Sequence, residues 1–291
     1  MKDNHKMTAV IVLYNVTEII YQCLENLKNI KIIIIDNGDN NPKIIKNIKQ
    51  HKNIIKYFKF KKNIGFGRAC NFGFSFVNTD YTLLIEPDVL IKEKDIFNLL
   101  NSFENYPRTA IAVPILINKE NQIIDYLDNL PELHSKTKDL FSKNINEILS
   151  RKKLEGDTSV NFCWAAIMLL NNKIIRKTGL FNKKIFIFWE DFFLCRKLKK
   201  LKLPITKIFS ARAIHLEGMS TKKNFKSQFI IEKHHVLSSY IYFDINKKDS
   251  YLTKKMFLFF FRFVTYFLIF NFKSSFKNLA RFCAVISYKY L

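Results

Sequence analysis

Tyr81–Leu90 reads Tyr-Thr-Leu-Leu-Ile-Glu-Pro-Asp-Val-Leu, an apolar run that stops at two carboxylates. Such a run predicts a strand buried on both faces, as in a parallel sheet packed between helices. Ligands of open α/β sheets bind just beyond the carboxyl ends of the strands. Glu86 and Asp88 are therefore expected where a charged ligand or a divalent cation would bind. A solvated turn at the end of a strand is the alternative interpretation.

Length and composition indicate a globular chain with room for one large α/β domain or two small ones. It has 291 residues, of which 48% are hydrophobic and 25% are charged. The formal net charge of +23 favours a phosphate-bearing partner, either nucleic acid, an anionic lipid or a nucleotide. The five cysteines are widely spaced and form no CxxC, which predicts free thiols in a reducing compartment. The N-terminal residues show no secretory signal pattern, so we expect a cytoplasmic protein.

The N-terminal part of the chain predicts a βαβ unit. Thr8–Tyr14 and Lys31–Asp36 read as buried strands, and the apolar residues between them fall on one face of a helix. Parallel strands joined by a helix place their carboxyl ends on the same edge of the sheet. The residues expected on this ligand-binding edge are Tyr14, Asn15, Asp36 and Asn37.

A glycine-bearing turn at residues 61–73 is expected to open a helix. Free N–H groups at the start of a helix favour anions, and Arg68 adds a guanidinium group suited to phosphate. The turn is not a P-loop, because GxxxxGK[ST] is absent. A tight turn at Gly65, with Arg68 as a surface charge, is the alternative interpretation.

Two more acids, Glu190 and Asp191, follow Trp189 at the expected start of a helix. Carboxylates in the first turn of a helix are ordinarily caps that offset the helix dipole. Here the flanking residues are aromatic, and an apolar setting raises the pKa of a carboxylate toward that of a useful base. Glu190 and Asp191 are therefore candidate catalytic residues.

Trp164 and His215 are candidates by position. Val160–Leu170 reads as a strand in which small residues beside Trp164 would let a flat ligand approach, with core packing as the alternative. His215 follows two short expected strands, Ile205–Phe209 and Ala211–Ile214, in an acidic neighbourhood. A lone histidine is more often structural than a ligand, so its position at the end of a strand is the main argument for a functional role.

The composition changes near residue 246, where we expect a first domain (1–245) to give way to a C-terminal helical segment (246–291). Met256–Phe272 is mostly apolar and aromatic, but it is too short and too interrupted to predict a transmembrane span. Flanking lysines suggest a helix that lies on an anionic membrane surface. Packing on the domain or at a homodimer interface is the alternative. Residues 118–157 read as a polar insertion or helical flap without assignable chemistry.

The order of these motifs resembles that of inverting nucleotide-sugar glycosyltransferases of the GT-A fold, the family-2 group, and within it the bacterial rhamnosyltransferase-like members. The resemblance implies an α/β fold, with a Rossmann-like, mixed and mainly parallel sheet between helices, followed by an aromatic and basic helical extension. It spans residues 7–240 and rests on Val10–Tyr14, Ile35-Asp36-Asn37-Gly38, residues 63–73, Glu86-Pro87-Asp88, Trp189-Glu190-Asp191, and His215 with Ser220.

For the donor, the resemblance implies a nucleotide site and a metal site. Asp88 and His215 would hold Mg²⁺ or Mn²⁺ at the diphosphate. The usual Asp-x-Asp is Glu86-Pro87-Asp88 in this chain, so Asp88 carries most of the expected metal binding. The nucleotide site would comprise Tyr14, Asn15, Asp36, Asn37, Asn63, Gly65, Arg68 and Glu86.

For the acceptor, the resemblance implies a single displacement in which Asp191, beside Glu190, deprotonates a hydroxyl group. Trp164 and Trp189 would line the acceptor side. The expected donor is a dTDP-sugar such as dTDP-rhamnose, or a UDP-sugar. The expected acceptor is a glycan or lipid-linked sugar in surface polysaccharide biosynthesis, at the inner face of the cell membrane.

Two other classes of function stay open. A basic nucleic-acid- or membrane-binding protein without catalysis would explain the charge, but no nucleic-acid-binding motif accompanies it, and we expect no nucleic acid partner. A sugar nucleotidyltransferase would need a glycine-rich basic loop after the first strand. The chain has Tyr14-Asn15-Val16-Thr17 at that position.

Overall fold

The protein is described by a computed structural model, in two compact units. The described residues are 6–38, 40–125, 130–131, 156–216 and 225–291. Within them, the second unit consists of Lys184–Trp189 and residues 225–291, and the first unit of the rest. Most of the expected insertion at 118–157 lies outside the described residues.

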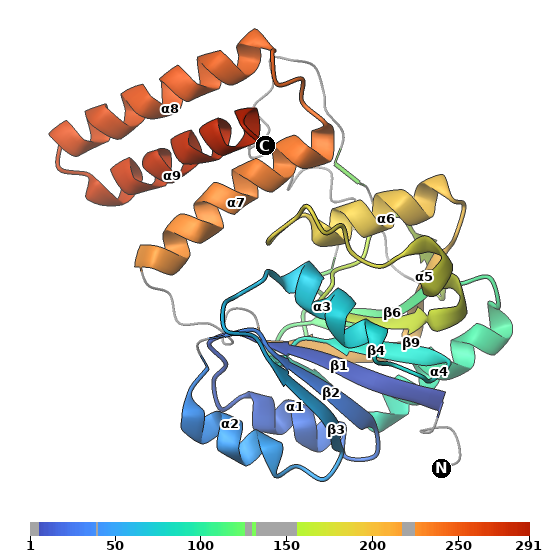
Figure 1. The fold of residues 1–291 in the computed structure, drawn as a ribbon. Helices are drawn as coiled ribbons and strands as arrows, with labels where there is room; N and C mark the ends of the chain where they lie inside the picture. The colour runs from blue at the N-terminus through green and yellow to red at the C-terminus, as the bar shows by residue number, and fades with distance from the viewer. Residues whose placement is uncertain (1–5, 39, 126–129, 132–155, 217–224) are drawn as a thin grey trace. The chain divides into compact units, whose positions relative to one another are not determined.

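The first unit is built on a mixed sheet of nine described strands, in the order β3-β2-β1-β4-β8-β6-β9-β5, with β7 paired to β9 (Figure 1). The first four strands of this order run parallel to one another, as do β6 and β9, and the other pairs are antiparallel. This architecture confirms the expected α/β fold class. The strands are β1 (Met7–Leu13), β2 (Lys31–Asp36), β3 (Ile54–Lys59), β4 (Tyr81–Ile85), β5 (Val89–Ile91), β6 (Ile111–Ile117), β7 (Thr158–Val160), β8 (Ile167–Asn171) and β9 (Ile205–His215).

Helices cover both faces of this sheet. One face carries α1 (Ile20–Asn26), α2 (Pro42–Lys49) and α4 (Glu93–Asn105), and the other carries α3 (Phe66–Ser75), α5 (Asn172–Thr178) and α6 (Glu190–Lys200). The sequence of β1 is an unbroken apolar run because both faces of this strand are buried. Successive side chains of a strand point to opposite faces, so Ile11 packs with the first set of helices and Val12 with the second.

One glycine decides how closely α3 lies against the sheet. A Cβ atom at Gly73 would be 2.5 Å from Cγ1 of Val10 and 3.1 Å from Cγ1 of Ile35. The missing side chain therefore lets the last turn of α3 pack closely against β1 and β2.

Two expected strands differ from the structure. Val160–Leu170 is interrupted by a loop at 161–166 between β7 and β8, so Trp164 lies on a loop instead of a strand. The two short strands expected at 205–214 are one strand, β9. Pro114 and Ile115 of β6 pair with Ile208 and Arg212, so residues 209–211 of β9 bulge out of the pairing at the point where the sequence pattern breaks.

The second unit contains three long helices, α7 (Phe225–Phe243), α8 (Ser250–Leu268) and α9 (Phe272–Lys289). Helix α9 packs against both α7 and α8. The shared core joins Val236 and Tyr240 of α7 to Leu252 and Phe259 of α8 and to Val285 of α9. The unit therefore takes in α7, and its boundary precedes the change in composition at 246 that we used to place it.

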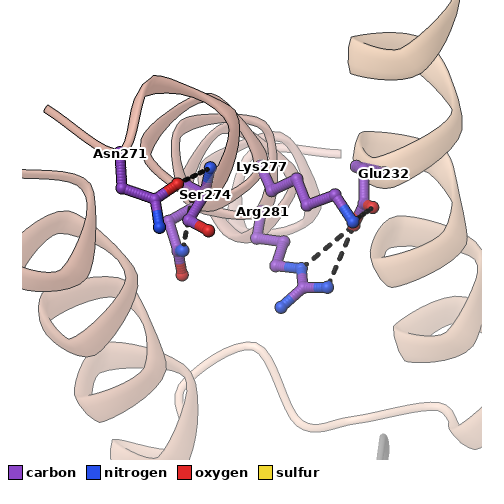
Figure 2. A network of polar contacts seen from close by, with 6 residues as sticks. Glu232, Asn271, Ser274, Lys277 and Arg281 are labelled. Carbon is purple, nitrogen blue, oxygen red and sulfur yellow. Dashed lines mark hydrogen bonds and ion pairs between the residues drawn. The ribbon is translucent and has the colours of Figure 1, made fainter. Parts of the chain in front are cut away.

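Polar contacts also join these helices (Figure 2). Glu232 of α7 lies 3.3 Å from Lys277 Nζ and 3.0 Å from Arg281 Nη2, both in α9. The side chain of Asn271 accepts a 3.1 Å hydrogen bond from the Ser274 amide and so caps the start of α9. Partly exposed ion pairs contribute little stability, so the apolar core remains the main support of this unit.

The structure differs from the single helix that we expected over Met256–Phe272, because a cap at Asn271 starts a second helix. Phe270 adopts a left-handed backbone conformation with φ of +58°, and Asn271 starts a new helix. The aromatic run is therefore split between α8 and the turn that joins it to α9. In the described part of the chain, no helix combines the length and the apolar character needed to cross a membrane.

Candidate active site

Asp36 lies at the carboxyl end of β2 and is fully buried. Its Oδ1 accepts hydrogen bonds from Asn40 Nδ2 at 2.5 Å and from the Gly38 amide at 3.3 Å, and the Tyr57 hydroxyl donates to Oδ2. Burial and the hydrogen bond to Asp36 raise the pKa of Tyr57 above its ordinary value, so this hydroxyl keeps its proton and donates. The carboxylate is thus held rigidly at the edge of the sheet.

Tyr57 and Asn40 were not singled out from the sequence. Tyr57 reads as an ordinary residue of β3, and only the parallel pairing of β2 with β3 brings it beside Asp36. Asn40 accepts a hydrogen bond from the Val16 amide at 2.9 Å and so also ties the turn after β1 to this carboxylate. The position of Asn40, a polar residue in the turn after Asp36, was the one local sequence signal that it could bind this carboxylate.

Asn37 and Asn63 join the end of β2 to the turn before α3. Asn37 Nδ2 donates to Asn63 Oδ1 at 3.0 Å, and Asn37 Oδ1 accepts from the Ile64 amide at 3.0 Å. Asn63 Oδ1 also accepts from the Gly65 amide at 2.8 Å. Gly65 is the N-cap residue of α3 and has φ of +92°, a conformation that favours glycine. These predicted residues are brought together, and their side chains shape the turn.

Arg68 is exposed on the first turn of α3 and donates from Nε to the Lys183 carbonyl at 2.7 Å. One turn later, the Asn71 side chain exchanges two 2.9 Å hydrogen bonds with the backbone of Phe181. Both residues hold the segment that leads toward α6. The sequence motif contained Asn71, but its anchoring role became visible only in the structure.

Tyr14 and Asn15 follow β1 directly and are both half-buried. Asn15 has φ of +50°, a left-handed conformation that asparagine tolerates better than most residues. The structure places both residues on the same sheet edge as Asp36, because β1 and β2 pair in parallel up to Leu13 and Asp36.

Glu86, Asp88 and His215 form a compact donor cluster. His215 Nε2 lies 3.5 Å from Glu86 Oε2 and 3.8 Å from Asp88 Oδ1, and one ligand atom from each residue lies within 4.8 Å of the others. The antiparallel pairing of β5 with β9 sets Val89 opposite His215 and so brings the histidine to the β4–β5 turn.

The chemistry of this donor set fits a divalent cation. Two carboxylates and an imidazole offer oxygen and nitrogen ligands of the kind that Mn²⁺ and similar ions accept. Asp88 is 1% exposed, whereas the Glu86 and His215 side chains keep 30% and 19% of their surface exposed. The cluster therefore combines one buried carboxylate, that of Asp88, with two partly exposed ligands, Glu86 and His215.

Glu190 and Asp191 are buried in the first turn of α6, each with 8% of its surface exposed. Burial raises the pKa of both carboxyl groups, and the charge of Asp191 adds to the effect on Glu190. For Asp191, hydrogen bonds from backbone amides, including a 2.8 Å bond from Phe192, oppose the rise. Among the described residues, no hydrogen-bond partner reaches Glu190 Oε2.

The two groups of acids converge in the first unit. The charge of Glu86 raises the pKa of both Glu190 and Asp191, which requires these carboxylates to lie near each other. Helix α3 also lies beside this pair, because a Cβ at Gly67 would be 3.6 Å from the Cβ of Glu190. The β4–β5 turn, the start of α3 and the start of α6 therefore border one site.

The two tryptophans have different surroundings. Trp164 is 37% exposed on the loop before β8, and the next residue, Ala165, contributes a backbone hydrogen bond to Asp191. Trp189 is 6% exposed, with ring centroids 5.1 Å from Tyr242 and 5.5 Å from Phe243 of α7. The Trp189 ring is therefore largely enclosed by aromatic side chains of its own unit, whereas the Trp164 ring is partly exposed.

The end of β2 carries a buried carboxylate, and a cluster of metal-ligand type lies in the same mixed α/β unit as a pair of buried acids at the start of α6. The solved structures that resemble this arrangement of strands and helices are glycosyltransferases of the GT-A fold. Residues 8–179 match the model of the family described as glycosyl transferase family 2. The chain belongs to this family, which confirms the resemblance found in the sequence.

Two bacterial proteins are similar in sequence. The rhamnosyltransferase WbbL of Escherichia coli (strain K12) is 24% identical over 245 residues, a match that covers 80% of this chain and 90% of that protein. The minor teichoic acid biosynthesis protein GgaB of Bacillus subtilis (strain 168) is 28% identical over 124 residues, covering 38% of this chain and 14% of that protein.

Solved structures share the fold at low sequence identity. GalNAc-T7 with UDP, GalNAc and Mn²⁺ has a TM-score of 0.59 and 14% identity, over 81% of this chain and about half, 48%, of that chain. The mannosyltransferase PcManGT from Pyrobaculum calidifontis, in complex with GDP-Man and Mn²⁺, has a TM-score of 0.54 and 9% identity. That match covers 97% of this chain and 73% of the mannosyltransferase.

Proposed function

We propose that this chain is an inverting, divalent-metal-dependent glycosyltransferase. It moves a sugar from a nucleotide-diphosphate donor to a hydroxyl group of a glycan or lipid-linked acceptor in surface polysaccharide biosynthesis. The observation that carries the proposal is the convergence of the Glu86–Asp88–His215 cluster with the buried pair Glu190 and Asp191. A single displacement needs both a base for the acceptor and charge compensation for the departing diphosphate.

Asp191 is the proposed base. Its raised pKa makes it a stronger base than an exposed aspartate, and the amide of Phe192 holds Oδ1 in a fixed position. The acceptor oxygen gives its proton to this carboxylate as it forms a bond to the anomeric carbon. The bond from that carbon to the diphosphate breaks, the nucleoside diphosphate leaves, and the configuration at the carbon inverts.

Glu190 supports this step from the adjacent position. Its pKa is raised by burial and by the charge of Asp191, so the two carboxyl groups titrate as a pair and share protons near neutral pH. A protonated Glu190 keeps the total negative charge of the pair low and leaves Asp191 as the ionised partner. It also limits repulsion between the pair and the anionic donor.

The donor site is proposed at the sheet edge. Asp36, held by Tyr57 and Asn40, accepts hydrogen bonds from the nucleoside, with Tyr14 and Asn15 beside it and Asn37, Asn63 and Gly65 forming the next turn. Glu86, Asp88 and His215 are the residues that would hold Mg²⁺ or Mn²⁺. When bound, such a cation supplies charge neutralisation for the leaving diphosphate. Arg68, exposed at the start of α3, adds a positive charge on this side.

Trp164 is the proposed acceptor-side residue. It is partly exposed on the loop that also contacts Asp191, and an indole face suits the apolar face of a sugar ring. We favour dTDP-rhamnose as the donor, because a rhamnosyltransferase is similar over 80% of this chain, with a UDP-hexose as the second choice. We place the reaction at the cytoplasmic face of the cell membrane, where a lipid-linked acceptor would be present.

Incubation of the purified chain with dTDP-rhamnose, UDP-hexoses and GDP-mannose tests the proposal. We expect one donor to raise the melting temperature in the presence of Mn²⁺ or Mg²⁺ and not in EDTA. With a lipid-linked glycan acceptor, the same donor should release its nucleoside diphosphate, and NMR of the product should show an inverted anomeric centre. Absence of binding by every donor with metal present would contradict the proposal.

A further inference from the structure

The turn between α8 and α9 is made of large apolar side chains that its own unit leaves exposed. The exposed fractions are 54% for Phe267, 69% for Leu268, 62% for Ile269, 80% for Phe270 and 54% for Phe272. Turns in water are ordinarily polar, because their backbone and side chains face solvent. An apolar turn of this size indicates a surface that is covered by a partner.

The apolar surface continues along α8 and is bordered by positive charge. Phe257, Phe260 and Phe261 are also exposed, at 64%, 48% and 68%. Arg262 and Lys273 flank the turn on its two helices, and both are exposed. Helices α8 and α9 pack side by side as a hairpin, and this turn joins them at one end (Figure 1).

The charge pattern selects the kind of partner. From Ser250 to Leu291 the chain has seven Lys and Arg residues and no Asp or Glu, and two of the seven, Lys277 and Arg281, pair with Glu232 of α7. A symmetric interface formed by the α8–α9 turns of two copies would bring Arg262 and Lys273 of each copy together with no acid from this segment to pair them. An anionic lipid surface offers both the negative charge and an apolar layer for the aromatic side chains.

We propose that the α8–α9 turn, Phe267–Phe272, inserts into the interfacial layer of an anionic bilayer, with Arg262 and Lys273 at the headgroups. This differs from a helix that lies flat on the membrane, because the cap at Asn271 bends the aromatic run into a hairpin end. The backbone of the turn keeps its hydrogen bonds on insertion. Ile269 and Phe270 donate to the Thr265 and Phe267 carbonyls at 3.2 and 3.1 Å, and Asn271 donates to Tyr266 at 2.9 Å. The proposal does not depend on the proposed catalysis.

Vesicle flotation of the full chain tests this insertion without any donor or acceptor. Wild-type protein should float with phosphatidylcholine vesicles that contain phosphatidylglycerol, and a measurable part should stay bound at high salt, where purely electrostatic binding is lost. The variant Leu268→Ser/Phe270→Ser keeps every charge. We expect it to bind at least about tenfold more weakly at high salt, because each inserted side chain contributes apolar burial.

The matched control is Tyr290→Ser/Leu291→Ser. It removes two apolar side chains of the same unit that are 87% and 66% exposed, and it should float like wild type. Arg262→Gln/Lys273→Gln should weaken binding to anionic vesicles at low salt and leave residual binding at high salt. Circular dichroism of all variants checks that the helices form.

Three results would overturn the proposal. The first is no flotation of wild-type protein with anionic vesicles at low salt. The second is equal flotation of wild type and the Leu268→Ser/Phe270→Ser variant at high salt. The third is light scattering that shows a wild-type dimer converted to a monomer by the same variant while vesicle binding is unchanged, since the turn would then be a contact between copies.

Discussion

His215 Nε2 lies 3.5 Å from Glu86 Oε2, although Glu86 lies in the β4–β5 turn and His215 ends β9, far along the sequence. This contact exists because β5 reverses direction after Pro87 and pairs with the end of β9. The contact adds His215 to the two acids of the β4–β5 turn, Glu86 and Asp88, and so forms a cluster of three donor groups. Each member of this cluster can be tested by mutation.

Asp88→Asn should abolish the metal dependence of nucleotide binding. Asp88 is the buried carboxylate of the donor cluster, and an amide is a much weaker ligand for Mg²⁺ or Mn²⁺. We expect the dissociation constant for the nucleoside diphosphate with Mn²⁺ to rise at least about tenfold, to the value that wild type shows in EDTA. Isothermal titration calorimetry with and without Mn²⁺ measures this. The control is Asp80→Asn, because Asp80 is an exposed acid just before β4. This variant should bind the nucleotide as wild type does.

Asp191→Asn should stop transfer and leave nucleotide binding intact. The loss of a general base lowers the rate by about 100-fold to 10,000-fold. Release of nucleoside diphosphate in the presence of acceptor measures the rate, and thermal shift measures donor binding. Glu104→Gln, an exposed acid at the end of α4, should keep full activity. Full transfer activity in Asp191→Asn would remove this residue from the mechanism.

Tyr57→Phe should weaken nucleotide binding with little change in kcat. The lost hydroxyl leaves the buried Asp36 carboxylate with one hydrogen bond fewer and less fixed in orientation. A hydrogen bond to a charged group is worth roughly 1.5–3 kcal/mol, so a rise of about tenfold in KM for the donor is reasonable. Tyr21→Phe is the matched control, because its hydroxyl bonds to the exposed Asn47 side chain instead. Equal KM values for the two variants would refute a positioning role for Tyr57.

The pH profile of transfer should report the raised pKa values of the acid pair. The base must be ionised, so activity should fall as pH drops through the raised pKa of the pair. That point lies well above the range in which exposed carboxyl groups titrate. Glu190→Gln replaces a group that is still protonated while Asp191 ionises, so it should leave this acidic limb close to its wild-type position. An acidic limb in the ordinary carboxyl range for wild type would contradict this assignment.

Glu190→Gln should also stabilise the protein at alkaline pH. A carboxyl group whose pKa is raised by folding favours the folded state below its unfolded pKa and loses that contribution as pH rises through the folded pKa. At pH 8 the wild type therefore carries a cost that the amide lacks. We expect the variant to be more stable by roughly 1–3 kcal/mol at this pH and closer to wild type at pH 5. Urea unfolding at both pH values measures the difference.

Local sequence pattern was enough to locate the first four strands of the sheet, the polar residues at their ends and the family. Buried parallel strands require unbroken apolar runs, and a positive φ favours glycine, so Lys31–Asp36, Tyr81–Ile85 and Gly65 could be located from local pattern alone. The order of the motifs then indicated the fold. The pair Glu190 and Asp191 was likewise recognisable from the sequence as candidate catalytic residues.

Only the tertiary structure decided which of these residues meet. The pairing of β2 with β3 gave Asp36 its partner Tyr57, and the pairing of β5 with β9 gave Glu86 its partner His215. Burial, which raises the pKa of Asp191 and covers Trp189, depends on elements packed from distant parts of the chain. Strand order and burial arise from contacts between distant residues, and a local pattern carries no information about its distant neighbours.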